Sequence, residues 1–314
     1  METVTGTNLE TAAAWLKQGD VVAIPTETVY GLAANALDEK AVVKIFEAKN
    51  RPFFDPLIVH VKDREAIHAL TTTIEAPLND LLTAFSPGPI TVLLPKNALV
   101  PDLTTSGLSH VGIRIPAHPL LRELLQMLSF PLAAPSANPF GYISPTTAAH
   151  VMQQLQGKIP YVLDGGRCDV GVESTIVGME GKEVVIYRAG GISVEAIESV
   201  VGKVTLSLNK SSNPLAPGQL ATHYAPRKPL YIGHPPELLT QFNGRCAVLS
   251  FHTQYTPDTM VLSPTGNLKE AARQLFHALR ELDASDCDQI ISEVFPNEGL
   301  GRAINDRLTR ASVR

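Results

Sequence analysis

The sequence predicts a two-domain protein of mixed α/β architecture, and two observations support this. The chain has 314 residues, whereas one hydrophobic core usually serves roughly 100–200 residues. Apolar runs of strand length alternate with helical stripes, and this pattern dissolves between residues 203 and 228. We therefore expect an N-terminal domain over residues 1–202, a linker over 203–228 and a smaller C-terminal domain over 229–314.

The first elements alternate between capped helices and buried strands. Asn8 has the chemistry of an N-cap and precedes an apolar helical stripe, and Gly19 follows the last turn of that helix. An apolar run of strand length occupies residues 21–24. Asp38 then caps a second amphipathic helix that ends near Lys49.

The rest of the first domain shows the same two periodicities. Apolar runs predict strands at 57–61, 90–94, 111–115, 130–134, 161–163, 174–177 and 184–187. Helical spacing predicts helices at 75–85, 119–128 and 147–156. The connections are irregular and rich in proline.

Beyond the linker, strands and helices alternate strictly. Asn267 and Glu270 stand in capping-box spacing at the start of a long amphipathic helix that reaches Leu282. The remaining elements are strands at 230–232, 247–250 and 289–292, a helix at 236–242 and a last helix from about residue 300. This order indicates a Rossmann-like α/β domain with a small, largely parallel sheet covered on both faces.

The overall composition is that of a globular protein with an acidic balance. Hydrophobic residues make up 44% of the chain and charged residues 18%, which is enough apolar material for a sizeable core. A net charge of −5 argues against a broad cationic surface for nucleic acid. No apolar stretch reaches the roughly 18 residues of a membrane span, and no signal sequence is evident, so we expect a cytoplasmic protein without membrane attachment.

Polar side chains gather on three short turns that are punctuated by proline or glycine. These turns are residues 25–32, 49–52 and 134–138, and they carry hydroxyls, cations and amides. Such segments cannot contribute a core stripe, and functional groups often lie on loops held by a rigid scaffold. The sequence therefore predicts a binding site. It contains neither a GxxxxGK[ST] phosphate loop nor a GxGxxG motif.

Lys49 and Arg51 lie at a predicted helix end, where Pro52 prevents the helix from continuing. One interpretation is a favourable charge at the C-terminal end of the helix dipole. The other is an anion clamp, since Arg offers a planar fork for phosphate oxygens and Lys a movable charge.

Ser136 and Asn138 follow a buried strand, at a position where ligands commonly bind in α/β sheets. Their uncharged donors suit phosphate or ribose, but they are also typical of a simple Ser or Asx turn. Ser144 lies at a loop and helix start and has the same two interpretations.

Arg114 and His60 each interrupt an apolar strand. A lone strand His is more often a satisfied core residue, but Arg is almost never fully buried unless it is paired. Arg114 therefore needs an anionic partner, either a protein carboxylate or a ligand carboxylate. Ser174 and Arg188 add a hydroxyl and another cation near glycine turns, and this inventory suits phosphoryl or nucleotidyl transfer.

Taken together, these motifs closely resemble the YrdC-like family over about residues 8–200. The matching segments are 25–32 (PTETVYGL), 49–52 (KNRP), 56–60 (PLIVH), 87–91 (PGPIT), 112–116 (GIRIP), 135–138 (PSAN), 173–176 (ESTI) and 188–190 (RAG). The tail, including 223–226 (HYAP), resembles the long two-domain form of the family, the L-threonylcarbamoyladenylate synthases. The resemblance implies a twisted, open, mixed sheet in the first domain.

The resemblance also implies an activity. L-threonine, bicarbonate and ATP would be joined into threonylcarbamoyl-AMP with release of pyrophosphate, which makes the enzyme a nucleotidyltransferase. The product would feed the threonylcarbamoyl modification of adenosine beside the tRNA anticodon, through downstream transfer proteins and with at most weak tRNA contact by this chain. Mg²⁺ would accompany ATP, and we expect no metal held by the protein itself.

Site residues carry over from the family motif by motif. The catalytic nucleotide-binding set implied by the resemblance is Lys49, Arg51, Ser136 and Asn138. Further ATP-contacting positions are Asp55, His110, Ser144, Arg188 and Tyr224, of which Asp55 replaces an Asn of many relatives. The positions implied for threonine are Thr28, His60, Arg114, Ala134 and Ser174. The linker with Tyr224 could close over the site as a lid.

Two other functional classes stay open from the sequence. The same domain could bind double-stranded RNA or tRNA without catalysis, although the acidic composition disfavours this. It also occurs in hydrogenase-maturation carbamoyltransferases, whose acylphosphatase and zinc-binding segments are missing here.

Overall fold

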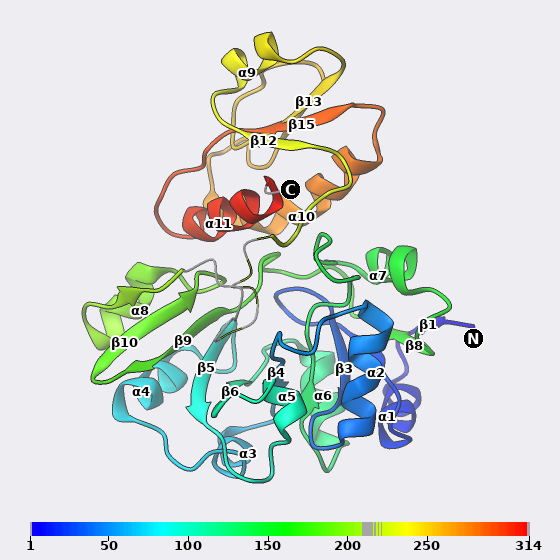
Figure 1. The fold of residues 1–314 in the computed structure, drawn as a ribbon, viewed down its shortest axis with the longest axis vertical. Helices are drawn as coiled ribbons and strands as arrows, with labels where there is room; N and C mark the ends of the chain where they lie inside the picture. Colours follow the sequence, from blue (N-terminus) through cyan, green and yellow to red (C-terminus); the bar gives the residue numbers. More distant parts are fainter. Residues whose placement is uncertain (1, 209–215, 217, 219, 221, 313–314) are drawn as a thin grey trace.

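The structure is a computed structural model that describes residues 2–208, 216, 218, 220 and 222–312. Within this part of the chain, the molecule consists of a large N-terminal α/β body and a smaller C-terminal one (Figure 1). Each body has a sheet of its own, with eleven strands in the first and four in the second. The predicted mixed α/β, two-domain fold is confirmed.

The N-terminal sheet is mixed and runs in the order β1-β8-β2-β3-β7-β4-β6-β5-β9-β10-β11. The sheet contains parallel pairs, such as β4 with β6, and antiparallel pairs, such as β5 with β6. Its strands are β1 (Val4–Gly6), β2 (Val22–Ile24), β3 (Gly31–Asn35), β4 (Ile58–His60), β5 (Ile90–Pro95), β6 (His110–Arg114), β7 (Leu132–Ala133), β8 (Tyr161–Leu163), β9 (Thr175–Glu180), β10 (Glu183–Arg188) and β11 (Thr205–Leu206).

Helices cover this sheet and bury their apolar stripes against it. The predicted caps form: the side chains of Asn8 and Asp38 accept hydrogen bonds from the first turns of α1 and α2. The helices are α1 (Leu9–Lys17), α2 (Glu39–Lys49), α3 (Arg64–His68), α4 (Ala76–Phe85), α5 (Asp102–Thr105), α6 (Pro119–Gln126), α7 (Ala148–Leu155) and α8 (Val194–Val201).

The C-terminal domain is the predicted α/β unit with a parallel sheet, in the order β12-β15-β13-β14. Its elements are β12 (Leu230–Ile232), α9 (Pro235–Gln241), β13 (Cys246–Ser250), β14 (Thr259–Val261), α10 (Leu268–Ala284), β15 (Gln289–Ser292) and α11 (Gly301–Ser312). The predicted capping box at α10 forms only in part. Asn267 caps the helix, but the Glu270 carboxylate accepts instead from the Ser263 hydroxyl, at 2.5 Å.

Some elements differ from the sequence-based prediction. Residues 31–35 form β3, whereas residues 31 and 32 were expected to belong to a turn. No strand was predicted there because Gly-Leu-Ala-Ala-Asn lacks the β-branched residues that mark strands. The first sheet also continues through β11, inside the segment predicted to be linker. The strands β1 and β14, the short helices α3 and α5 and the helix α8 were not predicted.

The two domains meet across α10 and α11, which lie between the C-terminal sheet and the N-terminal body (Figure 1). A single apolar cluster spans this junction, with Val29 and Ile143 from the first domain packed together with Phe276 and Leu308 from the second. The junction therefore holds both halves through a shared core as well as through polar contacts. No helix within the described residues has the length and apolar character needed to cross a membrane.

Candidate active site

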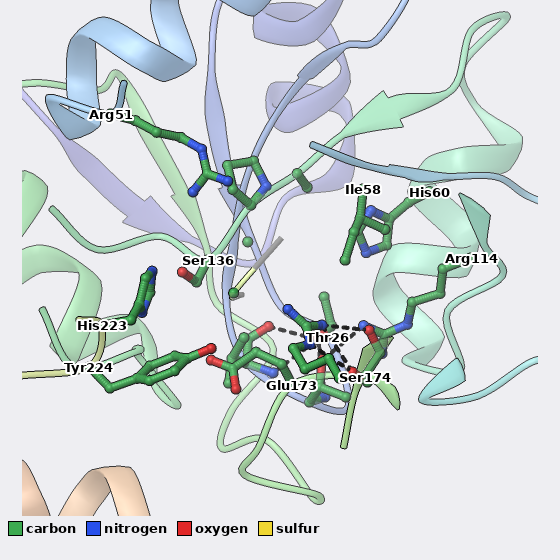
Figure 2. A pocket seen from close by; sticks show the side chains of 17 residues that line it. Thr26, Arg51, Ile58, His60, Arg114, Ser136, Glu173, Ser174, His223 and Tyr224 are labelled. Atoms are coloured by element: carbon green, nitrogen blue, oxygen red, sulfur yellow. Dashed lines mark hydrogen bonds between the residues drawn. The ribbon is translucent and has the colours of Figure 1, made fainter. Parts of the chain in front are cut away.

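A pocket lies where the N-terminal domain faces the linker (Figure 2). Strand ends and the loops after them supply most of its wall, and the linker supplies the rest. The lining residues are Thr26, Thr28, Val29, Gly31, Arg51, Ile58, His60, Arg114, Ala134, Pro135, Ser136, Glu173, Ser174, Arg188, Gly218, His223 and Tyr224.

Arg51 reaches the pocket because α2 stops immediately before it. Asn50 adopts a left-handed conformation at φ 50°, which reverses the chain at the helix end. The Arg51 guanidinium then pairs with Asp55 (Nη2 to Oδ2, 2.8 Å) and donates to the Pro56 carbonyl (2.9 Å). Asp55 is fully buried, and burial raises the pKa of its carboxyl although nearby cations oppose this. Asp55 therefore anchors Arg51 and lies outside the pocket lining.

Lys49 supports the neighbouring turn from behind. Its ammonium donates to the carbonyls of Ser136 and Asn138, and the side chain is buried outside the pocket lining. Burial, together with the Arg51 charge, holds the pKa of Lys49 well below its ordinary value. The Asn138 amide is also engaged, since it donates to the carbonyls of Pro139 and Tyr142 at 2.8 Å each.

Arg114 has the buried anionic partner that the sequence required. Its Nη2 lies 2.7 Å from the Glu27 carboxylate. Its Nη1 donates to Thr28 Oγ1 at 3.0 Å, and its Nε donates to the Gly88 carbonyl at 3.2 Å. Burial alone would raise the pKa of Glu27, but the Arg114 charge and hydrogen bonds outweigh it and lower the pKa. The partner is thus a protein carboxylate, one of the two alternatives left open.

The wall around Arg114 contains both polar and apolar side chains. His60 is buried beside it, and burial lowers the pKa of its imidazole to about 3, so His60 is neutral at physiological pH. The Ser174 hydroxyl lies 2.7 Å from the Thr91 hydroxyl and accepts from Arg188 at 3.0 Å. Ile58 and Ala134 supply apolar surface. This end suits a small ligand that carries a carboxylate, a hydroxyl and a methyl group.

The linker closes the opposite side. Tyr224 has a left-handed backbone at φ 64°, which is strained for a non-glycine residue and orients its ring toward the pocket. The ring stacks on Phe276 of α10, with centroids 5.6 Å apart. His223 contacts Phe140 edge to face, and burial lowers the pKa of His223 to about 3.

The pocket is nearly filled by its own side chains. The cavity measures about 50 Å³. Ligand sites in proteins commonly measure roughly 300–1,000 Å³. The cavity is therefore much smaller than a typical ligand site.

Two family profiles match the chain in succession. The profile Sua5_yciO_yrdC, described as "Telomere recombination", matches residues 14–190, and Sua5_C, described as "Threonylcarbamoyl-AMP synthase, C-terminal domain", matches residues 192–313. The chain belongs to the Sua5/YrdC family. The match of the second profile identifies the long, two-domain form.

Known members of the Sua5/YrdC family are similar over nearly the whole chain. The threonylcarbamoyl-AMP synthase of Pyrococcus abyssi is 39% identical over 96% of this chain and 93% of its own length. The Bacillus subtilis protein of the same name is 41% identical over 96% and 92%. A crystal structure of P. abyssi Sua5 complexed with L-threonine superposes with a TM-score of 0.92 at 37% identity, and covers 99% of this chain and 97% of that one.

The structure brings most of the predicted site residues of this Sua5/YrdC protein into one pocket. Those that line it are Thr28, Arg51, His60, Arg114, Ala134, Ser136, Ser174, Arg188 and Tyr224. Lys49, Asp55, Asn138 and Ser144 are buried outside the lining and contact lining residues or their backbone. His110 is exposed at the start of β6, about 13 Å along the strand from Arg114, which ends it.

Among the lining and adjoining residues that sequence reasoning did not assign, three are charged: Glu27, Glu173 and Arg307. Glu27 was part of a quoted motif, but its pairing with Arg114 joins positions far apart in the chain. Glu173 adjoins Ser174 and lines the pocket, where it meets Arg307 of α11. Arg307 lies in the predicted last helix, and nothing local indicates that it is buried or which residue it pairs with.

Proposed function

We propose that this chain joins L-threonine, bicarbonate and ATP into threonylcarbamoyl-AMP and releases pyrophosphate, as a nucleotidyltransferase. Family membership supports the proposal, and so does the threonine complex of the P. abyssi relative. The observation that carries it is a single pocket with two chemically distinct ends. Arg51 and Ser136 line one part, Thr28, His60 and Arg114 line another, and Arg188 lies against Ser174 beside the second.

Arg114 is the group we assign to the threonine carboxylate. A guanidinium carries five N–H donors, so its contacts with Glu27, Thr28 and the Gly88 carbonyl leave donors for a ligand. Those same contacts fix the plane of the guanidinium before the ligand arrives. Ile58 and Ala134 would accept the threonine methyl group, and Ser174 its hydroxyl.

The chemistry needs charge neutralisation more than a protein nucleophile. Threonine's amine takes up carbon dioxide with loss of a proton, or bicarbonate with loss of water, to give a carbamate. A carbamate oxygen then attacks the α-phosphorus of ATP, and pyrophosphate leaves. Arg51 and Arg188 would stabilise the charge that develops on the phosphate oxygens. Lys49 would act indirectly, because its ammonium holds the backbone of Ser136 and Asn138.

Carbamates decompose readily in water, which gives the enclosing linker a chemical purpose. Tyr224 and His223 occupy the side of the pocket that faces the second domain. We expect these two side chains to move aside when the substrates bind and then to cover the site again. In that position they would exclude bulk water while the carbamate exists. Both side chains are uncharged near neutral pH, since burial raises the pKa of Tyr224 to about 12 and lowers that of His223 to about 3.

Mg²⁺ belongs to this proposal as part of the ATP substrate. Within the described residues, no group of three His, Cys, Asp or Glu side chains is placed to hold a metal ion. The carboxylates nearest the pocket are already engaged, Asp55 by Arg51, Glu27 by Arg114 and Glu173 by Arg307. We therefore propose that Mg²⁺ enters with ATP, since these three carboxylates already have cationic partners.

We further propose that the product serves tRNA threonylcarbamoylation in the cytoplasm, through separate transfer proteins. An acyl-adenylate is a mixed anhydride, so its acyl group is activated for transfer to an amine. The acidic net charge of −5 is consistent with a protein that hands on a small molecule and does not itself grip tRNA over a large surface.

The test is pyrophosphate release from ATP by the purified full-length chain. We expect release to require both threonine and bicarbonate, with formation of a threonine-containing adenylate detected by mass spectrometry. ATP turnover that is indifferent to threonine would exclude the proposed reaction. Salt-sensitive tRNA binding without any ATP turnover would instead favour the RNA-binding alternative.

A further inference from the structure

One residue of the C-terminal domain, Arg307 on α11, reaches the wall of the pocket. Its side chain is completely buried at the domain junction. Arg307 Nε lies 2.8 Å from the Glu173 carboxylate of the first domain, and its guanidinium carbon lies 5.3 Å from the centre of the Tyr224 ring. Asp306 pairs with its Nη1 at 2.7 Å and holds the guanidinium in place. Arg307 thus connects three parts of the molecule.

Glu173 connects Arg307 with the nucleotide end of the pocket. One carboxylate oxygen faces Arg307, and the other accepts a hydrogen bond from the Ser144 hydroxyl at 2.6 Å. Burial alone would raise the pKa of Glu173, but the charges of Arg307 and Arg188 and these hydrogen bonds lower it. In Figure 2, Tyr224 points toward Glu173, so the ring and the carboxylate are neighbours on the pocket wall.

The same helix also holds the backbone of the linker. Arg310, one turn after Asp306, pairs with Asp306 at 2.9 Å and donates to the Leu220 carbonyl at 2.5 Å. The backbone N–H of His223 donates to the Arg310 carbonyl at 3.2 Å. Helix α11 therefore contacts the linker immediately before Tyr224, while Arg307 contacts the ring of Tyr224 itself.

We propose that Arg307 is a positioning residue for the nucleotide end of the pocket, through which the C-terminal domain fixes Glu173 and the Tyr224 ring. The identity of the ligand as ATP rests on the proposed function. A guanidinium suits this role because it can fork between two carboxylates while its flat face packs on an aromatic ring, which a lysine ammonium cannot do. The residues assigned to threonine have their hydrogen-bond partners in the first domain, apart from α11.

The inference separates the two ligands. Without Arg307, Glu173 would keep a buried charge with no guanidinium opposite it, and Tyr224 would lose the cation that packs on its face. Both changes fall next to residues assigned to ATP, since Glu173 is bonded to Ser144 and Arg307 packs on Tyr224 itself. We therefore expect weaker nucleotide binding with nearly unchanged threonine binding.

The experiment compares Arg307→Met and Arg307→Lys with a matched control, Arg302→Met, all in the full chain. Arg302 lies on the same helix and pairs across the same junction with Glu195, but both partners are partly exposed and neither lines the pocket. Calorimetry measures the dissociation constants of a non-hydrolysable ATP analogue and of threonine. Thermal unfolding verifies that each variant is folded.

For Arg307→Met we expect at least tenfold weaker binding of the ATP analogue, with threonine binding within twofold of wild type. Arg307→Lys should lose at least threefold for the analogue, and Arg302→Met should match wild type for both ligands. Analogue binding by a folded Arg307→Met that equals that of Arg302→Met would overturn the inference. An equal loss for threonine would do the same, because a general loosening of the fold would then explain the result.

Two further measurements keep the test decisive. If Arg307→Met does not fold, two other variants replace it: Arg307→Lys and the double variant Glu173→Gln/Arg307→Met. The double variant leaves no lone charge buried at this position. Both are judged by the same ratio of the dissociation constants for the ATP analogue and for threonine. Failure of the proposed function is separately visible. A wild-type chain that binds both ligands but releases no pyrophosphate would refute the reaction and leave the role of Arg307 to be decided by binding.

Discussion

Replacing Arg114 by methionine and Glu27 by glutamine together removes the buried ion pair at the threonine end of the pocket. Removal of Arg114 alone would leave the Glu27 carboxylate buried without its partner, a change that costs about 3–5 kcal/mol in proteins. The double variant Glu27→Gln/Arg114→Met avoids that penalty because it removes both charges. It also keeps side chains of similar size in a closely packed site.

The expected effect falls on threonine. A hydrogen bond between a charged donor and a ligand carboxylate contributes about 1.5–3 kcal/mol, and each 1.4 kcal/mol corresponds to a factor of ten in binding. The KM for threonine should therefore rise by about 10- to 150-fold. The KM for ATP should change by less than about threefold, since Arg51 and Ser136 lie on another part of the wall.

The assay is pyrophosphate release, with threonine varied at saturating ATP and ATP varied at saturating threonine. Arg245→Met is the control, because it removes a cation from an exposed ion pair with Asp258 in the second domain. It should behave as wild type. Equal increases in both KM values for the double variant would refute the division of the pocket into two ends.

Three further predictions concern the nucleotide end, the response to acid and the domain junction. Asp55→Asn/Arg51→Met should raise the KM for ATP at least tenfold, because Arg51 lines the pocket, and Lys49→Met should raise it as well. Both variants should lower the free energy of unfolding by about 2 kcal/mol, because two backbone carbonyls lose their donor: those of Asp55 and Pro56 in the first and those of Ser136 and Asn138 in the second. Urea unfolding would contradict this if either variant were as stable as wild type. Burial lowers the folded-state pKa of three histidines to about 3: His60, His150 and His223. An unfolded histidine takes up a proton near pH 6.5. The unfolded state therefore binds more protons than the folded state between about pH 3 and pH 6.5. Stability should therefore fall as the pH drops below 6.5, by at most about 1.4 kcal/mol per pH unit for each histidine, and His150→Asn should reduce that slope in urea titrations at pH 7 and pH 5. A fragment of residues 1–207 should retain the first sheet but unfold at a lower temperature than the full chain and bind a hydrophobic dye. The reason is that four apolar residues lose the second-domain side chains that cover them: Val29, Ile143, Val172 and Ala189. A fragment as stable as the full chain would show that the shared cluster contributes nothing to stability.

Local chemistry made much of the fold predictable. Asn8, Asp38 and Asn267 act as the helix caps that their positions indicated, since capping depends on a few neighbouring residues. The parallel C-terminal sheet followed from strict alternation of strands and helices. In contrast, β3 was not predicted, because Ala and Gly give no strand signal and only the neighbouring strands β2 and β7 define it.

The site was predictable where polar side chains lie on turns, and less so where distant partners decide their direction. Arg51, Ser136 and Arg114 meet in one pocket as the sequence indicated. Lys49 points to backbone carbonyls 87 and 89 residues away, and no local pattern could show this. The need of Arg114 for an anion was evident from its strand, but the choice of Glu27 required the fold.

The contribution of the second domain was the least predictable part. A Rossmann-like pattern indicated its shape but no role. Its pocket-facing group, Arg307, pairs with Glu173 across 134 residues of sequence. Such a contact depends on how two domains pack, which neither periodicity nor capping can define.

The most direct test of the central claim is a crystal structure of the full chain with L-threonine and a non-hydrolysable ATP analogue bound together. Our account predicts both ligands in the one pocket, with Arg51, Ser136 and Arg188 near the phosphates and Arg114 on the threonine carboxylate. A nucleotide bound at another surface, or threonine bound away from Arg114, would contradict it.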